Sequence, residues 1–178
     1  MSKAISSYKV YLCTYEVEKT TGNNPTDKYK YKLLIEIKDF PDMGGTPEML
    51  DCTTTSDAIQ CFIPGIQMLD NGGLEFTSNY TKDNYDKLLT QMGKEEDDDG
   101  KYAVVYGGTL NEADEVVTNN GEGAFLFNGK MSAYPKGGSV NSVVDLAISI
   151  APSTTIEYIK DENTAVLDRD KLTTTQGD

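Results

Sequence analysis

The fold is decided by the stretch Gly138-Ser-Val-Asn-Ser-Val-Val-Asp-Leu-Ala-Ile-Ser-Ile-Ala-Pro152, because apolar side chains recur at every second position through most of it. Successive side chains of a β-strand point to opposite faces, so this period predicts a strand over residues 139–151. The predicted core face consists of Val140, Ser142, Val144, Leu146, Ile148 and Ile150. The smaller and more polar face consists of Asn141, Val143, Asp145, Ala147, Ser149 and Ala151. Pro152 is expected to end the strand, since it lacks the amide hydrogen that a ladder needs.

Similar runs occur on both sides of this stretch and predict a mainly β chain. Strands are predicted at residues 8–15, 31–37, 48–55, 58–63, 74–80, 101–106 and 123–134, with a further one starting at 155. β-Branched and aromatic residues dominate these runs, and the chain contains eleven Tyr and five Phe. Pro64 and Gly65 are expected to interrupt the strand before them. The intervening polar segments predict loops at 20–28, 39–47, 94–100 and 111–123.

One helix is predicted, over residues 82–92. Thr81 can cap it with its hydroxyl, and Asp83 suits the positive amino end of the helix. Gly93 is expected to stop it, because glycine adopts the left-handed closing conformation most easily. The apolar stripe expected to face a core consists of Tyr85, Leu88, Leu89 and Met92.

Length and charge limit the possible functions. A chain of 178 residues most economically forms one domain, residues 1–178, with two small domains as the lesser alternative. A loose carboxyl-terminal tail is expected from about 161. The net charge of −13 and the single arginine, Arg169, argue against a surface that grips nucleic acid, since Lys and Arg supply that affinity. A simpler reading of the acidity is that it keeps the protein soluble. No run approaches the length of a membrane span, and no apolar signal segment is found at the amino end.

The residues for common catalytic sites are missing. There is no histidine, which removes the usual general base and the commonest metal ligand. Cys13, Cys52 and Cys61 have no metal-site spacing and are expected to be reduced thiols that act as small hydrophobes. The acidic run 95–100 fails as a calcium loop, because Tyr106 stands where the bidentate Glu is needed. We therefore expect no metal site, no cofactor and no enzymatic activity, while weak, non-specific cation binding by the acidic loop 94–100 remains open.

Several phrases occur in a characteristic order. They are Ser56-Asp57, Phe62-Ile-Pro-Gly65, Leu74-Glu-Phe-Thr-Ser-Asn-Tyr80, Asn84-Tyr-Asp-Lys-Leu-Leu89, Phe125-Leu-Phe-Asn-Gly-Lys-Met-Ser-Ala-Tyr134, Gly138-Ser-Val-Asn-Ser-Val143 and Ile148-Ser-Ile150. In this order and spacing, over about residues 48 to 158, the chain resembles the tail tube (major tail) proteins of long-tailed bacteriophages. The specificity lies in the series and not in any single phrase. The polar stretch 111–123 departs from the family pattern, which has a short turn there.

The resemblance implies a fold and an assembly. The fold would be an antiparallel β-sandwich or barrel with one flanking helix. Six copies would form a ring, and stacked rings would form a tube around a tape measure protein, with tail terminator and distal tail proteins at its ends. DNA would pass through without specific binding, in a virion tail assembled in the host cytoplasm. The residues implied to face the lumen are Glu75, Asp145 and Ser149, and those implied in ring-contact loops are Asn23, Asn24, Gly44 and Gly45.

Two other classes of function remain open on the sequence. A monomeric β-sandwich binding module, such as an adhesin or a carbohydrate-binding domain, would have similar strand patterns but would not self-associate. A hydrolase with two catalytic carboxylates is a weaker alternative, since any two of the 29 acidic residues could meet in a cleft. The absence of Trp and the scarcity of Arg disfavour a carbohydrate-processing site.

Overall fold

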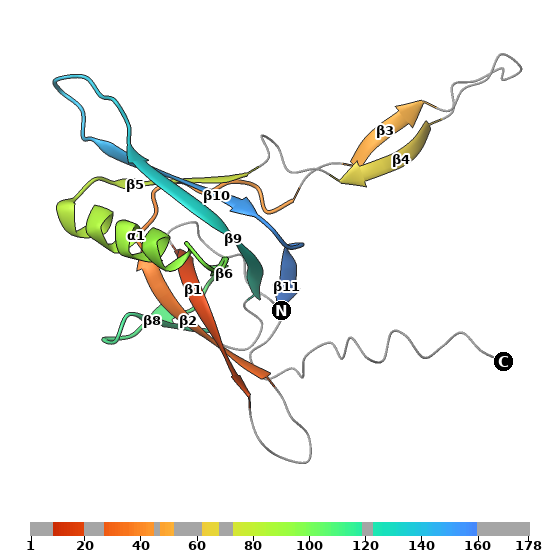
Figure 1. Cartoon of the computed structure of the whole chain (residues 1–178), viewed down its shortest axis with the longest axis horizontal. Helices are drawn as coiled ribbons and strands as arrows, with labels where there is room; N and C mark the ends of the chain where they lie inside the picture. Colours follow the sequence, from red (N-terminus) through yellow and green to blue (C-terminus); the bar gives the residue numbers. More distant parts are fainter. Residues whose placement is uncertain are drawn as a thin grey trace, which may run out of the picture. The chain divides into compact units, whose positions relative to one another are not determined.

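The computed structural model describes residues 9–19, 27–44, 47–51, 62–67, 73–118 and 123–159. These residues form a mainly β, antiparallel fold with one α-helix, as the sequence predicts (Figure 1). The chain divides into two compact units. Unit 1 contains residues 1–36, 101–127 and 157–178, and unit 2 contains residues 37–100 and 128–156.

Unit 1 is built on the antiparallel strand order β6-β1-β2-β8-β7. These strands are β1 (Val10–Lys19), β2 (Asp27–Ile35), β6 (Gly100–Tyr106), β7 (Thr109–Leu110) and β8 (Glu115–Val117). The first part of β9 (Gly123–Pro135) adjoins β6, and β11 (Glu157–Ile159) pairs with residues 124–126 of β9. Aromatic rings join these last strands, since Phe125 lies 5.5 Å from Tyr106 and 5.0 Å from Tyr158 between ring centroids.

The core of unit 1 includes a cluster of small and medium side chains. Its buried members are Cys13, Tyr31, Ala103, Val105, Val116, Ala124 and Leu126. Cys13 is fully buried, and this burial raises the pKa of its thiol, because a thiolate is poorly solvated there. Cys13 therefore behaves as the small hydrophobe that the sequence predicts, whereas Cys52 and Cys61 lie outside the described residues.

The polar stretch 111–123 is not simply a loop, because its first part folds into the hairpin β7–β8. The Asn111 side-chain oxygen accepts the amides of Ala113 and Glu115, each at 2.9 Å, and this closes the turn. β8 pairs with β2, and the Leu33 amide donates to the Asp114 carbonyl at 2.7 Å. The hairpin thus extends the sheet at β2, which the polarity of the stretch concealed.

Unit 2 contains the strand order β5-β10-β9 and a separate two-stranded sheet. β5 is Leu74–Asn79, β10 is Asp145–Pro152, and the second part of β9 lies beside β10. The small sheet pairs β3 (Pro47–Asp51) with β4 (Phe62–Gln67). The prediction that Pro64 and Gly65 interrupt a strand is wrong, because β4 runs through both residues. β4 has a described partner only on the β3 side, and proline is tolerated at such an edge.

The predicted strand 139–151 is shorter than expected, since β10 begins only at Asp145. Hydrogen bonds between Ser139 and Ser142 hold a turn in the preceding segment, and local serine bonds of this kind compete with a strand ladder. Val140 and Val144 are consequently exposed instead of lying on the core face. β10 itself keeps the predicted alternation, with Leu146, Ile148 and Ile150 buried.

The predicted helix is present as α1 (Lys82–Lys94). The Thr81 hydroxyl accepts the Asn84 amide at 3.1 Å, which confirms the cap, and Leu88 is completely buried. Leu89 was placed on the wrong face, because it is 44% exposed. Gly93 does not stop the helix. The helix ends one residue later, at Lys94. Glu95 follows as the capping residue: its amide donates to the Met92 carbonyl, and its side chain accepts the Met131 amide.

Candidate functional site

The register of β5, β10 and β9 places the three residues implied to face a lumen on one surface of the sheet. Ser149 on β10 is paired with Glu75 on β5 and with Ser132 on β9. Asp145 lies four residues before Ser149 on the same strand, so its side chain points to the same side. Glu75 is exposed, while Asp145 and Ser149 are partly exposed. We call this surface of β5, β10 and β9 the polar face.

The opposite face of these strands is buried. It contains Leu74, Phe76, Ser78, Met131, Ala133, Leu146, Ile148 and Ile150, none of which is more than 9% exposed. The prediction that Leu146 and Ile148 fill the core is therefore confirmed, and Phe76 on β5 is buried with them. A slip of one residue would bury Asp145 and expose Leu146, so the register of the polar face is fixed by the core behind it.

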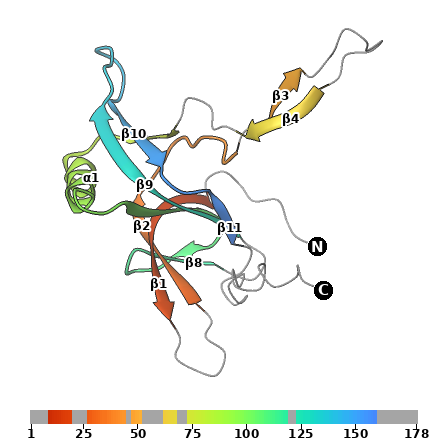
Figure 2. The ribbon, with the colours of Figure 1, turned by 45° about the vertical axis from the view of Figure 1, so that its right-hand side comes forward.

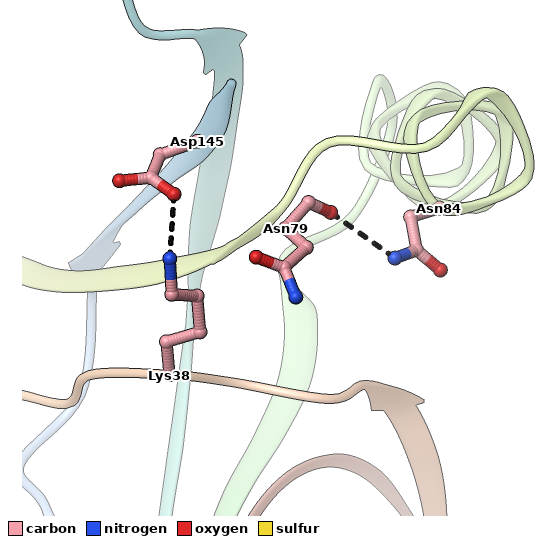
Figure 3. A network of polar contacts seen from close by, with 4 residues as sticks. All are labelled: Lys38, Asn79, Asn84 and Asp145. Atoms are coloured by element: carbon pink, nitrogen blue, oxygen red, sulfur yellow. Dashed lines mark hydrogen bonds and ion pairs between the residues drawn. The ribbon is translucent and has the colours of Figure 1, made fainter. Parts of the chain in front are cut away.

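The Asp145 carboxylate is paired with a positive charge. The Lys38 ammonium lies 2.8 Å from its carboxylate and forms an ion pair with it (Figure 3). Both side chains are partly exposed, so the pair contributes at most about 1 kcal/mol to stability. Its larger effect is on charge, because the Lys38 ammonium neutralises the Asp145 carboxylate.

Backbone bonds along β5 fix the position of Lys38. The Lys38 amide donates to the Thr77 carbonyl at 2.7 Å, and the Thr77 amide donates to the Asp39 carbonyl at 3.1 Å. At the end of the same strand, the Asn84 side-chain amide donates to the Asn79 carbonyl at 3.2 Å (Figure 3). Residues 38–39 and the start of α1 therefore satisfy part of the outer edge of β5, an edge that would otherwise attract other strands.

The polar face carries charges of both signs. Its carboxylates are Glu75 and Asp145, and its cations are Lys38, which reaches over from beside β5, and Lys130, which lies two residues before Ser132 on the same side of β9. Two negative and two positive side chains give a formal charge near zero. Most of the chain's negative excess of −13 therefore lies elsewhere.

Glu95 is a buried exception in the predicted acidic loop. Its carboxylate accepts the Met131 amide at 2.8 Å, and its carbonyl accepts from the Lys130 ammonium at 3.3 Å. Burial raises the pKa of the Glu95 carboxyl, while the bond from Met131 partly opposes this rise. Glu95 thereby supplies an acceptor to the backbone of β9. Its position in a run of acids gave no sign that it differs from its neighbours.

Of the residues predicted in ring-contact loops, Gly44 is among those that the structure describes. Gly44 lies in an exposed bend. Asn23, Asn24 and Gly45 lie outside the described residues, and so does the predicted tail from about 161. The prediction for these loops stays a prediction.

Two kinds of feature, a metal-binding cluster and a membrane-spanning helix, are absent from the described part of the chain. Within these residues, no cluster of three or more His, Cys, Asp or Glu side chains is arranged to hold a metal ion. No helix among them is long and apolar enough to span a membrane.

Comparisons with known proteins give a similarity of structure but none of sequence. No protein-family model matches the chain, and no curated protein matches it. Among solved structures, the chain is similar to one in the cryo-EM structure of the anti-feeding prophage (AFP) baseplate, 6-fold symmetrised, with a TM-score of 0.47 and 13% sequence identity. The alignment covers 90% of this chain and 98% of that chain. A similarity at this level does not establish a shared function.

Proposed function

We propose that this chain is a structural subunit of a phage-tail-like particle, in which it assembles into stacked hexameric rings that form the tail tube. The observation that carries the proposal is the ordered series of sequence phrases described above. Four of the phrases fall on elements of unit 2 or on β9: residues 74–79 on β5, 84–89 on α1, 125–134 on β9 and 148–150 on β10. These four phrases thus lie on three adjacent strands and the one described helix.

The polar face fits the proposed passage of DNA. A wall that DNA must slide along cannot offer a surplus of Lys and Arg, because each would bind phosphates by releasing counterions. On this face, Lys38 is paired with Asp145 and Lys130 donates to the Glu95 carbonyl. We propose that Glu75, Asp145 and Ser149 face the lumen, and that the ion pair keeps Lys38 from acting as a phosphate site.

The remaining parts of the proposal follow from the tail tube role. The partners would be further copies of the chain, a tape measure protein inside the tube, and tail terminator and distal tail proteins at its ends. The protein would function in the virion tail, be assembled in the host cytoplasm, and have a structural rather than a catalytic role.

The test is self-assembly of the purified chain. Negative-stain electron microscopy and sedimentation over a wide concentration range should show six-membered rings or hollow tubes. Tail initiator proteins should be supplied in a parallel sample, because they can be required to start polymerisation. A protein that stays monomeric in both samples at high concentration contradicts the proposal and favours the binding module instead.

A further inference from the structure

Large apolar side chains are exposed together on one part of unit 2. Of the ten that are exposed among the described residues, five lie in the loop 136–144 or in the segment 80–89. Val140 is 102% exposed and Val143 is 70% exposed, so neither takes part in the core. Single exposed apolar residues are common on proteins, but a group of them marks a contact surface.

A backbone hydrogen bond, a ring contact and helix spacing link much of this group. The Tyr80 amide donates to the Val144 carbonyl at 3.0 Å, and the Tyr80 and Tyr85 rings are 5.9 Å apart. Leu89 follows Tyr85 by four residues, which places both on the same side of α1. The loop–helix surface, as we name it, consists of Tyr80, Tyr85, Leu89, Val140, Val143 and Val144. Its loop projects beyond the ends of β9 and β10 (Figures 1 and 2).

The loop is held in a fixed conformation. The Ser142 amide donates to the Ser139 carbonyl at 3.1 Å, and the Ser142 hydroxyl donates to the same carbonyl at 2.9 Å. The Ser139 amide in turn donates to the Ser142 hydroxyl at 3.0 Å, which closes the turn around Val140. A preformed turn loses little conformational entropy on binding, so it suits a contact element. None of these bonds needs the valine side chains, which leaves their presence unexplained by the fold.

The charges around the loop–helix surface indicate the partner. The whole chain has a net charge of −13, so most contacts between two copies would bring like charges together. The segment 80–90 instead contains two Lys and two Asp, and the segment 136–145 contains one Lys and one Asp, so the net charge of each is zero. Two copies can therefore meet at these two segments without that repulsion. Lys and Asp side chains can also pair across the contact. An anionic membrane or a nucleic acid would require a positive excess, which neither segment has.

We propose that the loop–helix surface docks onto a second copy of this chain, with the Val140 turn inserted into an apolar part of the neighbouring copy. The inference rests on the proposed assembly and names the surface that mediates it. A contact between two different surfaces of identical copies closes into a ring when the rotation allows, as the hexamer requires.

The experiment combines polar substitutions with cross-linking in the full chain. The double variant Val140→Asn/Val143→Asn removes the apolar tip while leaving the turn bonds in place. Val117→Asn is the matched control, because Val117 on β8 is a valine that is 44% exposed outside this surface. Circular dichroism melts confirm that both variants fold. A photoreactive phenylalanine analogue at position 140, read by mass spectrometry, identifies the neighbour directly.

The expected results test the loop–helix surface separately from the proposed tail tube function. The wild type and Val117→Asn should assemble alike, whereas the double variant should need a concentration at least about tenfold higher, since each buried valine is worth about that factor. Position 140 should cross-link to a peptide of another copy. If the double variant assembles at the wild-type concentration, the surface is wrong and the tube reading stands. If the wild type never assembles, the tube reading fails and this inference fails with it. Binding of the wild type to anionic lipid vesicles that the double variant loses would overturn the inference in favour of a membrane contact.

Discussion

Replacing Glu95 with alanine is expected to destabilise the unassembled protein by about 1.5–3 kcal/mol, the typical contribution of a hydrogen bond to a charged group. In the wild type, the Glu95 carboxylate accepts the Met131 amide at 2.8 Å in a site where Glu95 is only 5% exposed. Alanine removes that acceptor and leaves the amide buried. Glutamine keeps a side-chain oxygen at the same position without a buried charge, so Glu95→Gln should be at least as stable as the wild type at neutral pH.

The dependence on pH follows from the raised pKa of Glu95. A carboxyl that binds its proton more tightly in the folded state contributes stability below its unfolded pKa, and this contribution is lost as the pH rises through the folded pKa. The wild type should therefore lose this contribution as the pH rises from about 4 towards neutral, and Glu95→Gln should show a flatter profile. The difference between the two proteins in the slope of stability against pH therefore reports the titration of the Glu95 carboxyl.

The assay is urea unfolding of the monomeric subunit between pH 4 and 8, with hydrogen exchange of the Met131 amide as a local readout. Glu96→Ala is the matched control, because Glu96 is the exposed neighbour in the same acidic run. It should leave both the midpoint and the exchange of Met131 unchanged. If Glu95→Ala and Glu96→Ala are equally stable and protect Met131 equally, Glu95 does not hold β9 and the reasoning fails.

Three further outcomes are expected. Leu88→Ala should cost about 2–5 kcal/mol in thermal or urea unfolding, because Leu88 is fully buried, whereas the solvent-facing Lys87→Ala should not shift the midpoint. Thr81→Ala should cost about 0.5–2 kcal/mol in the same assay through loss of the cap, and no change would mean that the cap is not formed in solution. Particles carrying Glu75→Lys/Asp145→Lys should assemble but eject DNA more slowly, most clearly at low salt, and equal rates at two ionic strengths would remove the lumen assignment.

The strands with a buried face could be predicted from the sequence because period two is a local property. Leu146, Ile148 and Ile150 alternate with small or polar residues, so the faces of β10 followed directly from the order of residues. The same rule failed upstream, where Val140 and Val144 continue the alternation. A turn held by two serines overrides the pattern there, and the period itself contains no information about such a turn.

The interactions that shape the candidate site could not be predicted, because they join residues far apart in the chain. Lys38 and Asp145 are separated by 107 positions, and Glu95 and Met131 by 36. The sequence around Lys38 does not distinguish it from the other lysines. Its role follows only from the fold, which places residues 38–39 beside Thr77. The exposure of Leu89 could not be predicted for a related reason. A stripe of four apolar residues on a helix does not show which of them the core covers.

The ion pair between Lys38 and Asp145 changes how the proposed lumen should be understood. A lining of bare carboxylates would repel DNA, but it would also repel itself around a ring of six copies, at a cost that grows as salt is removed. Pairing one carboxylate of each copy with a lysine of the same copy relieves that repulsion without offering a free cation to phosphates. Glu75 then supplies the remaining negative charge at the position paired with Ser149. On this account Lys38→Ala should leave assembly intact at high salt and weaken it at low salt, because unpaired Asp145 carboxylates would then face one another around the ring. Assembly of Lys38→Ala that is independent of salt would show that these carboxylates do not converge on a common channel.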